Sequence, residues 1–463
     1  MPRTRAVLLL VPLLLAASAS VSGATCQPQA GAARTVITPD LARGPVWLAG
    51  YQQGRRATGV HDDLEVRALV LRCPSGSVVL AAVDLIGLFY DDVLAIRQGL
   101  AALPGMGQLS VIVAATHTHS GPDTLGMWGM DPATRGVDDA YLARVRRALV
   151  STITDAMANL RPARLRAGQI EAGDLLTRSR LPRVTYGTLT ALRIEEPLGG
   201  PPIATVILWG AHPEVLTPNN TLITADFPSS VRSAIEVRGG GLAIYFSGAV
   251  GAQTPHGVPI WDPATSRPAP EGGFRKADLL GAALARRAWD VLDTASDIPA
   301  EPIELRLREL SVQVTNARFE RLREIGVIRR SVSFRGNEPI PRVCTEADLI
   351  RIGDVTLIAV PGEIYPEIVR GGIQNPQDPA ADFPGAVREE PPLLELVPGR
   401  VKAVLGLAND ELGYIIPKSQ WDERPPFAYG LSKAQYGEVN SASYELGPLL
   451  HAAFREMAQA PGP

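Results

Sequence analysis

The sequence predicts an α/β protein in which a mixed sheet is flanked by helices and forms a single large catalytic domain. Short runs rich in β-branched residues alternate with longer segments that place apolar residues at three- and four-residue intervals. No fixed-period repeat or long low-complexity linker divides the chain. With 463 residues, 46% of them hydrophobic, the chain is long enough to bury an extensive core. We therefore expect one domain over residues 25–463.

Residues 1–24 are typical of a secretory signal peptide. Two arginines precede an apolar run from Ala6 to Ala17, and the small residues SASVSGAT follow it. The run is shorter than the ~20 apolar residues that a transmembrane helix needs, and no later segment reaches that length without charges or prolines. Cleavage is expected after Ala19 or Ala24, and no leucine stands upstream of Cys26 where a lipoprotein signal has one. We expect a secreted or periplasmic protein without a transmembrane segment.

The net charge and the cysteine content restrict the expected binding partners and the number of disulfides. The net charge is -3, and no run rich in Lys and Arg with interleaved aromatics occurs, so nucleic acid is not an expected partner. The three cysteines, Cys26, Cys73 and Cys344, allow one structural disulfide and leave one thiol over in an oxidising compartment. The sequence does not select the pair, and the spacing matches no metal site.

The individual elements follow from these patterns. Helical periodicity covers Asp139–Leu160, Lys276–Thr294 and Tyr444–Ala458. A further helix is expected after Asp226, with Asp226 as its N-cap and Pro228 in its first turn. Strands are predicted over six short runs, namely Val79–Val83, Leu109–Ala115, Ala204–Trp209, Leu242–Phe246, Val355–Val360 and Val401–Leu407.

Segments with chemically capable side chains follow five of these strands. In order along the chain they are THTHSGPD, GAHPE, SGAVGAQTP, PGEIYPE and ANDELGY. The carboxyl ends of strands form the ligand crevice in open α/β sheets. This arrangement therefore predicts an active site that is assembled from distant segments.

The pair His117 and His119 is the most informative of these features. Two of the six histidines of the chain stand two residues apart, so both side chains project to the same side if the strand continues through them. A metal ligand with a neighbouring catalytic group fits this geometry, whereas a single histidine would more often be a hydrogen-bonded core residue.

His212, Glu363 and Tyr414 are weaker signals when each is taken alone. His212 could be a buried histidine bonded to the backbone, Glu363 could cap the following helix, and Tyr414 could be a packed tyrosine. Their shared placement after strands supports a common site. His61, Asp62 and Arg178 are polar groups that could approach the site, and His256 and His451 are expected in a loop and on a helix surface.

The run VIVAATHTHSGPD resembles the histidine motif of the neutral, non-lysosomal ceramidases, which are zinc amidases that release the fatty acid from sphingosine. The similarity begins at GYQQGRRATGVHDDLEVRALVL, continues through GAHPEVL and ITADF, and ends with VPGE, GLANDELGYIIP and QYGEVNSAS. Matches in the same order over nearly the whole chain are more specific than any single motif.

This resemblance implies a set of functional residues. His117, His212, Glu363 and Tyr414 fall on the zinc ligands of the family, one ion per chain, and two nitrogens with two oxygens make a chemically reasonable zinc site. His119 and Arg178 fall on residues that contact the substrate or its developing charge. Tyr436 approximates another substrate-contacting tyrosine.

The sequence departs from the family at one catalytic position and in its extent. Where ceramidases have a serine in a Ser-Asn-x-Gly motif, this chain has Gly248, and Ser247 precedes it on the expected opposite face of the strand. We also do not expect the β-sandwich domain that many ceramidases carry after the catalytic domain.

The expected activity is hydrolysis of an N-acyl amide, such as ceramide, by a zinc-activated water without a serine nucleophile. His119 would move the proton to the leaving amine, and Arg178 would orient or neutralise an anionic part of the substrate. Two alternatives remain: an esterase or deacylase with another acyl substrate, and a non-catalytic metal-binding envelope protein. The expected partner is a small-molecule or lipid amide, and transient contact with a membrane surface is compatible with such a substrate.

Overall fold

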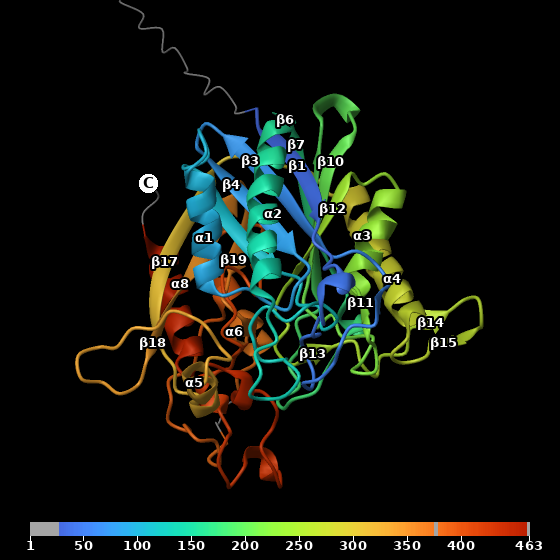
Figure 1. Ribbon diagram of the computed structural model, residues 1–463. Helices are drawn as coiled ribbons and strands as arrows, with labels where there is room; N and C mark the ends of the chain where they lie inside the picture. The colour runs from blue at the N-terminus through green and yellow to red at the C-terminus, as the bar shows by residue number, and fades with distance from the viewer. Residues whose placement is uncertain (1–26, 375–377, 461–463) are drawn as a thin grey trace, which may run out of the picture.

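The computed structural model describes residues 27–374 and 378–460. The predicted signal peptide and Cys26 therefore lie outside the described residues. Within the described residues, most of the β-structure belongs to three mixed sheets, and helices flank each of them (Figure 1). The predicted α/β class, a mixed sheet flanked by helices, is confirmed, although the strands are divided among several sheets.

The first sheet has the strand order β5-β4-β3-β1-β6, in which β4 and β5 are parallel. Both faces of β3 are buried, because successive side chains of a strand point to opposite faces of the sheet. Val66, Ala68 and Val70 pack under helices α1 and α2. Leu69 and Leu71 point to the opposite side. The elements are β1 (Gln29–Val36), β3 (Glu65–Cys73), β4 (Gly76–Val83), β5 (Ser110–Ala115), β6 (Arg161–Pro162), α1 (Tyr90–Ala101) and α2 (Asp139–Ala158).

The second sheet has the order β12-β10-β9-β7-β16, in which β10 and β12 are parallel. Helices α3 and α4 pack against each other and cover its outer face, where Trp209, Tyr245 and Phe227 meet edge to face. The elements are β7 (Arg164–Glu171), β9 (Thr188–Glu195), β10 (Pro202–Trp209), β12 (Leu242–Ser247), β16 (Asp297–Ile298), α3 (Phe227–Val237) and α4 (Phe274–Thr294).

The third sheet has the order β17-β18-β19-β21, in which β19 and β21 are parallel. Helix α8 contacts β17 and β18, and Phe454 of this helix is completely buried against the sheet. The elements are β17 (Ile303–Gln313), β18 (Arg342–Ile352), β19 (Val355–Ala359), β21 (Val401–Leu405), α6 (Pro366–Arg370), α7 (Leu393–Leu396) and α8 (Leu446–Gln459).

The inner faces of the three sheets share one hydrophobic core. Leu80 of the first sheet, Val206 of the second and Leu357 of the third are completely buried members of the same cluster. Each outer face has a separate cluster with its own helices. Figure 1 shows the result, with α1 and α2 on one side of the strands and α3 and α4 on another. Burial of both faces explains why so many strands are continuously apolar.

Short elements connect these layers. Four pairs of two-residue strands are β2 (Gly59–Val60) with β11 (Leu222–Ile223), β8 (Thr177–Arg178) with β13 (Gln253–Thr254), β14 (Trp261–Asp262) with β15 (Arg267–Pro268), and β20 (Glu363–Ile364) with β22 (Tyr414–Ile415). Helix α5 spans Ala317–Glu324, and short 3-10 helices are Leu41–Arg43, Gly173–Leu175, Pro197–Gly199, Lys418–Gln420, Ala428–Gly430 and Glu438–Asn440.

The elements predicted from periodicity are confirmed. The three predicted helices are α2, α4 and α8, and the six predicted strands are β4, β5, β10, β12, β19 and β21, with ends that differ by a few residues. Asp226 caps α3 as predicted, because its carboxylate accepts the Phe227 N–H at 2.6 Å. Cys73 is disulfide-bonded, and Cys344 is an exposed free thiol.

No helix among the described residues is both long and apolar enough to cross a lipid bilayer.

Glu389 should make the stability of the protein depend on pH. Burial raises the pKa of this carboxyl from its ordinary value of 4.5 to about 7. Because the pKa is raised in the folded state, the contribution of Glu389 to stability is complete below pH 4.5 and is lost as the pH rises through about 7. The free energy of unfolding of the wild type should fall between pH 5 and pH 8 because Glu389 ionises. In Glu389→Gln this fall should be smaller by roughly 2 to 3 kcal/mol, as measured by urea titrations at both pH values. Parallel stability curves for the two proteins would contradict this assignment.

Candidate active site

The segments that follow the parallel strand pairs of the three sheets meet at one place. Two backbone hydrogen bonds join the strand ends, from Ala115 N–H to Leu407 O at 3.1 Å and from Gly406 N–H to Ser247 O at 2.9 Å. They tie the end of β5 and the end of β12 to the segment after β21. Side chains that are hundreds of positions apart in the sequence therefore lie side by side.

His117 and His212 present the same ring nitrogen to this meeting point. The Nδ1 of His117 lies 2.7 Å from Ile86 O, and the Nδ1 of His212 lies 2.9 Å from Gln253 O. A backbone carbonyl only accepts, so each Nδ1 carries the donated hydrogen and leaves Nε2 free to bind a metal. Both imidazoles are buried, and their ring centroids are 5.1 Å apart.

Glu363 and Tyr414 reach the same point from the third sheet. They are register partners in the parallel pair β20 and β22, so their side chains leave the backbone together. Glu363 Oε2 lies 2.8 Å from His212 Nε2 and 3.5 Å from His117 Nε2. The Tyr414 hydroxyl lies 3.3 Å from His212 Nε2. The structure thus brings together all four residues that the sequence resemblance selects as ligands.

This donor set fits a divalent metal such as zinc. Ligand bonds of about 2.0 to 2.1 Å around a tetrahedral ion separate the donor atoms by about 3.3 Å. The distances from His212 Nε2 to Tyr414 and from His117 Nε2 to Glu363 are 3.3 Å and 3.5 Å. A second buried combination is also compatible with a metal, because ring nitrogens of His117, His119 and His212 lie within 4.8 Å of one another. Both sets contain His117 and His212.

The charges at the site also favour a cation. Burial opposes ionisation of Glu363, but the electrostatic interaction with His117 and hydrogen bonds with both histidines hold its pKa well below the ordinary value. Burial likewise opposes protonation of His212, yet the hydrogen bond to Glu363 raises the pKa of His212 to about 9. A metal that binds to His212 must displace this proton, so its affinity should fall as the pH falls.

His119 is a buried imidazole without a hydrogen-bond partner for either ring nitrogen among the described residues. Its nearest carboxylate is Glu214, whose Oε2 lies 3.7 Å from Nδ1. Burial lowers the pKa of His119 well below its ordinary value, and the charges of His117 and His212 add to this effect. Gly50 makes room for the ring, since a Cβ at this position would lie 2.4 Å from His119 Cγ. A neutral imidazole has one free lone pair with which it can accept a proton, and it can then pass that proton on.

Tyr436 and Arg178 have different positions relative to the site. Tyr436 is 61% exposed, and its ring meets the Tyr414 ring at a centroid distance of 5.7 Å. Arg178 makes two 2.6 Å hydrogen bonds to the Glu367 carboxylate, and both side chains are completely inaccessible. Since Glu367 and the Val184 and Arg180 carbonyls take up its donors, the structure gives Arg178 no path to a substrate. The expected role of Arg178 in binding an anionic group is therefore corrected to a structural one.

An apolar pocket opens beside the convergent donors. Its empty volume, including the part open to solvent, is about 900 Å³. His117, His119, Glu363 and Tyr414 form one part of its wall, and Tyr436 is a further wall residue. The hydrophobic side chains of the wall are Ile86, Phe89, Leu125, Met127, Trp128, Val314, Phe319, Ile328, Val332, Val343, Leu412 and Ala442. Such a wall suits an aliphatic chain better than a polar substrate.

Comparison with known proteins identifies the fold. No family model matches the chain, and no curated protein matches its sequence. Among solved structures, the neutral ceramidase from Pseudomonas aeruginosa matches with a TM-score of 0.72 at 19% identity, over 94% of this chain and 74% of that chain. The chain has the neutral ceramidase fold. A ceramidase complexed with C2 matches with a TM-score of 0.71 at 18% identity, over 94% of this chain and 75% of that chain.

The predicted resemblance to the neutral ceramidases is thereby confirmed for the fold. Within this ceramidase fold, Gly248 stands where the family motif has a serine, and the structure has space for a side chain at this position. A Cβ at Gly248 would meet its nearest neighbours, the backbones of Gly210 and Trp209, at an ordinary 3.5 Å. Ser247 points elsewhere, because its buried hydroxyl donates to Thr116 O at 2.8 Å.

Glu411 is a pocket residue that the sequence analysis did not select. It is 7% exposed, its Oε1 accepts the Gly413 N–H at 2.8 Å, and its Oε2 has no partner among the described residues. Burial raises the pKa of Glu411 well above its ordinary value, and the charge of Glu363 adds to the effect. The strand-end segment ANDELGY predicts a functional group, but the pattern does not show which of its carboxylates is buried.

The remaining polar candidates lie outside the donor cluster of the ceramidase fold. His61 stacks on Phe274 at a centroid distance of 3.6 Å and bonds Asp62 at 2.8 Å. His256 is partly exposed and lies 3.9 Å from Glu214. His451 is buried in α8 rather than on its surface, and its Nε2 lies 2.8 Å from Pro391 O.

Proposed function

We propose that this protein is a zinc-dependent hydrolase of an N-acyl amide, with ceramide or a similar lipid amide as its substrate. The observation that carries the proposal is the meeting of four metal-binding side chains, three of which line the wall of an apolar pocket. The ceramidase fold over 94% of the chain adds support, since the name of that enzyme denotes cleavage of an amide lipid. The signal-peptide pattern at the N-terminus supports action outside the cytoplasm.

Each residue of the site has a proposed task. His117, His212, Glu363 and Tyr414 hold the metal, which supplies Lewis-acid activation of water and of the scissile carbonyl. His119, whose ring nitrogens are free, accepts a proton from the attacking water and passes it to the leaving amine. The apolar wall binds the acyl chain and excludes water from it.

Metal analysis combined with a substrate panel tests the proposal. The purified protein should contain one zinc per chain, lose hydrolysis of long-chain N-acyl amides on chelation, and recover it with zinc. The panel should pair each amide with the corresponding ester, because the donor set alone does not distinguish an amidase from an esterase. Bound zinc with no turnover would favour a binding protein, and absence of bound metal would contradict both hydrolase assignments.

Ser247→Ala tests whether a serine is the nucleophile. We expect this variant to keep at least about a tenth of the wild-type kcat/KM, because the Ser247 hydroxyl is committed to Thr116 O and its loss removes one buried hydrogen bond worth about 1 kcal/mol. Progress curves on the best amide of the panel measure the effect. Complete loss of activity in Ser247→Ala with metal content unchanged would contradict the water mechanism.

Val332→Trp tests the assignment of the pocket to the acyl chain. Val332 is a half-buried wall residue, so an indole there should shorten the pocket without entering the central core. We expect at least a tenfold loss of kcat/KM for long acyl chains, on the basis of lost apolar contact, and little change for short ones. Val387→Trp is the control, since Val387 is 87% exposed and is not a wall residue. An equal loss of kcat/KM for all acyl-chain lengths would show that the acyl chain binds outside this pocket.

We also propose that the mouth of the pocket touches a membrane surface transiently during substrate uptake. Tyr436 and Val439 are 61% and 45% exposed, and Asn440 and Ala442 of the same segment are wall residues. Sedimentation with zwitterionic phospholipid vesicles should detect weak binding that Tyr436→Asp reduces. No difference between the two proteins would remove this part of the proposal.

A further inference from the structure

His117 has a backbone conformation that needs external support. Its φ is 68°, in the left-handed region that residues other than glycine seldom adopt. Such a conformation costs on the order of 1 to 3 kcal/mol and persists only where surrounding contacts over-determine it. It allows the His117 N–H to reach Leu85 O at 2.9 Å while the ring bonds Ile86 O at 2.7 Å. Its two neighbours in the chain, Thr116 and Thr118, make such contacts through their hydroxyls.

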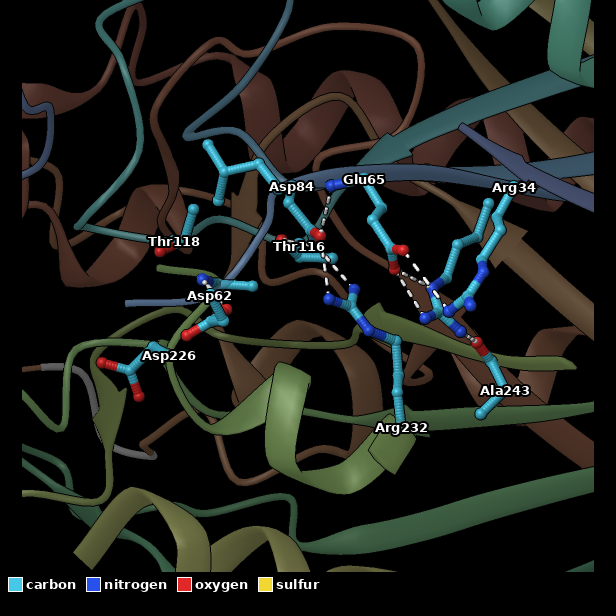
Figure 2. Close-up of polar contacts among 12 residues, drawn as sticks. Arg34, Asp62, Glu65, Asp84, Thr116, Thr118, Asp226, Arg232 and Ala243 are labelled. Carbon is cyan, nitrogen blue, oxygen red and sulfur yellow. Dashed lines mark hydrogen bonds and ion pairs between the residues drawn. The ribbon is translucent and has the colours of Figure 1, made fainter. Parts of the chain in front are cut away.

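Thr116 is tied to a buried ion pair on one side of His117. Its hydroxyl donates to Asp84 Oδ1 at 3.1 Å, and Asp84 has no exposed surface. Arg232 of helix α3 donates to both oxygens of Asp84, at 2.6 and 2.9 Å, and the Glu65 N–H donates at 2.9 Å (Figure 2). The Asp84 carboxylate, which accepts the Thr116 hydroxyl, is thus held in place by Arg232 and by the Glu65 N–H.

Thr118 is tied in a parallel manner on the other side. Its hydroxyl donates to Thr224 O at 2.8 Å, and the Thr224 hydroxyl in turn donates to Asp62. Asp62 also accepts the Ala225 N–H at 3.1 Å. Figure 2 shows Asp62, Asp84 and both threonines around the same stretch of chain. The first chain of bonds ends on Arg232 of α3, and the second passes through Thr224 in the segment immediately before α3 and ends on Asp62.

The two hydroxyls have no other evident task. Thr116 and Thr118 are completely buried, and neither is a wall residue of the pocket, so a substrate does not touch them. Among residues 27–374 and 378–460, their hydroxyls bond only to the protein groups named above and, for Thr118, to the Ser120 N–H at 3.2 Å. Valine would fill the same volume without these bonds.

We propose that Thr116 and Thr118 are positioning residues that hold His117 in its left-handed conformation. The anchor of Thr116 is Asp84, which Arg232 of α3 holds, and the anchor of Thr118 is the Thr224 carbonyl in the segment before α3. This inference rests on the proposed metal-dependent function, because the conformation aims His117 Nε2 toward Glu363. Partners that orient a metal-binding histidine typically change metal affinity by about 10- to 100-fold when they are removed.

Cobalt binding tests the proposal without reliance on turnover. We expect the Thr116→Val/Thr118→Val double variant to bind Co²⁺ about 10- to 100-fold more weakly than the wild type in chelator competition, with an altered visible d–d spectrum. The double serine variant, which keeps both hydroxyls, should restore both properties. Thr205→Val is the matched control, because the Thr205 hydroxyl is equally buried and donates to Gly240 O at 2.6 Å in the second sheet. It should lower stability but leave cobalt binding unchanged.

Two outcomes separate this inference from the proposed function. Wild-type cobalt affinity and spectrum in the double valine variant, with His117 still left-handed in its crystal structure, would overturn the positioning role alone. A wild-type protein that binds neither Co²⁺ nor Zn²⁺ would overturn the proposed function and the inference together.

Discussion

His212→Ala is expected to abolish stoichiometric zinc binding and to lower kcat/KM for the best amide substrate at least about a thousandfold. His212 Nε2 lies within 3.3 Å of both Glu363 and Tyr414, so its loss removes the donor that contacts the two oxygen ligands. A catalytic metal contributes several kcal/mol of transition-state stabilisation, which corresponds to a factor of about 10³. Elemental analysis and steady-state kinetics on the same preparation measure both effects.

His451→Ala is the matched control for this variant. His451 is also buried and also bonds a backbone carbonyl, but it lies in α8 and bonds Pro391 O instead of the donor cluster. It should lose some stability and keep both zinc and activity. Retention of zinc and activity in His212→Ala would show that the metal site is misassigned.

His119→Ala distinguishes the two compatible donor sets. If Glu363 and Tyr414 complete the site, this variant should keep its zinc and lose kcat, because only the proton-transfer group is missing. If the three histidines hold the metal, zinc should be lost in this variant as well.

Arg178→Met is expected to lower the free energy of unfolding by about 3 to 5 kcal/mol. The reason is that it leaves the Glu367 carboxylate buried and unpaired, where the wild type has two 2.6 Å hydrogen bonds at zero exposure. Urea unfolding followed by tryptophan fluorescence measures the loss. At temperatures where the variant remains folded, its KM should be close to that of the wild type.

Two further variants sharpen the Arg178 experiment. Arg287→Met breaks an equally close pair with Asp174, but Asp174 is 66% exposed, so its cost should stay below about 1 kcal/mol. Arg178→Met/Glu367→Leu removes both charges and should recover much of the lost stability. If Arg178→Met kept full stability and raised KM instead, the substrate role first expected for Arg178 would be reinstated.

The sequence predicts the helices and strands whose formation depends on a local pattern of apolar residues. Apolar periodicity sufficed for α2, α4 and α8 and for the strands that precede the site, because burial selects these patterns directly. Strands β3, β9 and β18 were not singled out. They join the strands of the parallel pairs to the rest of each sheet, and their pairing is a long-range property.

The candidate site was predictable in part, from the placement of its residues after strands and from the resemblance to the ceramidase motifs. His117, His212, Glu363 and Tyr414 follow strands, and the structure brings their donor atoms together. Arg178 also had a plausible motif, but its partner Glu367 lies 189 positions away, and an ion pair at that separation leaves no local signal. The burial of Glu411 depends similarly on distant segments that cover it.

The donor cluster also has a consequence for how the protein matures. His117 follows the first sheet, His212 follows the second, and the partners Glu363 and Tyr414 follow the third. No intermediate that lacks one sheet can assemble the full set, so tight metal uptake would report that the whole chain has closed around its shared core. The metal should therefore bind after the chain has folded, and it should then stabilise the native state.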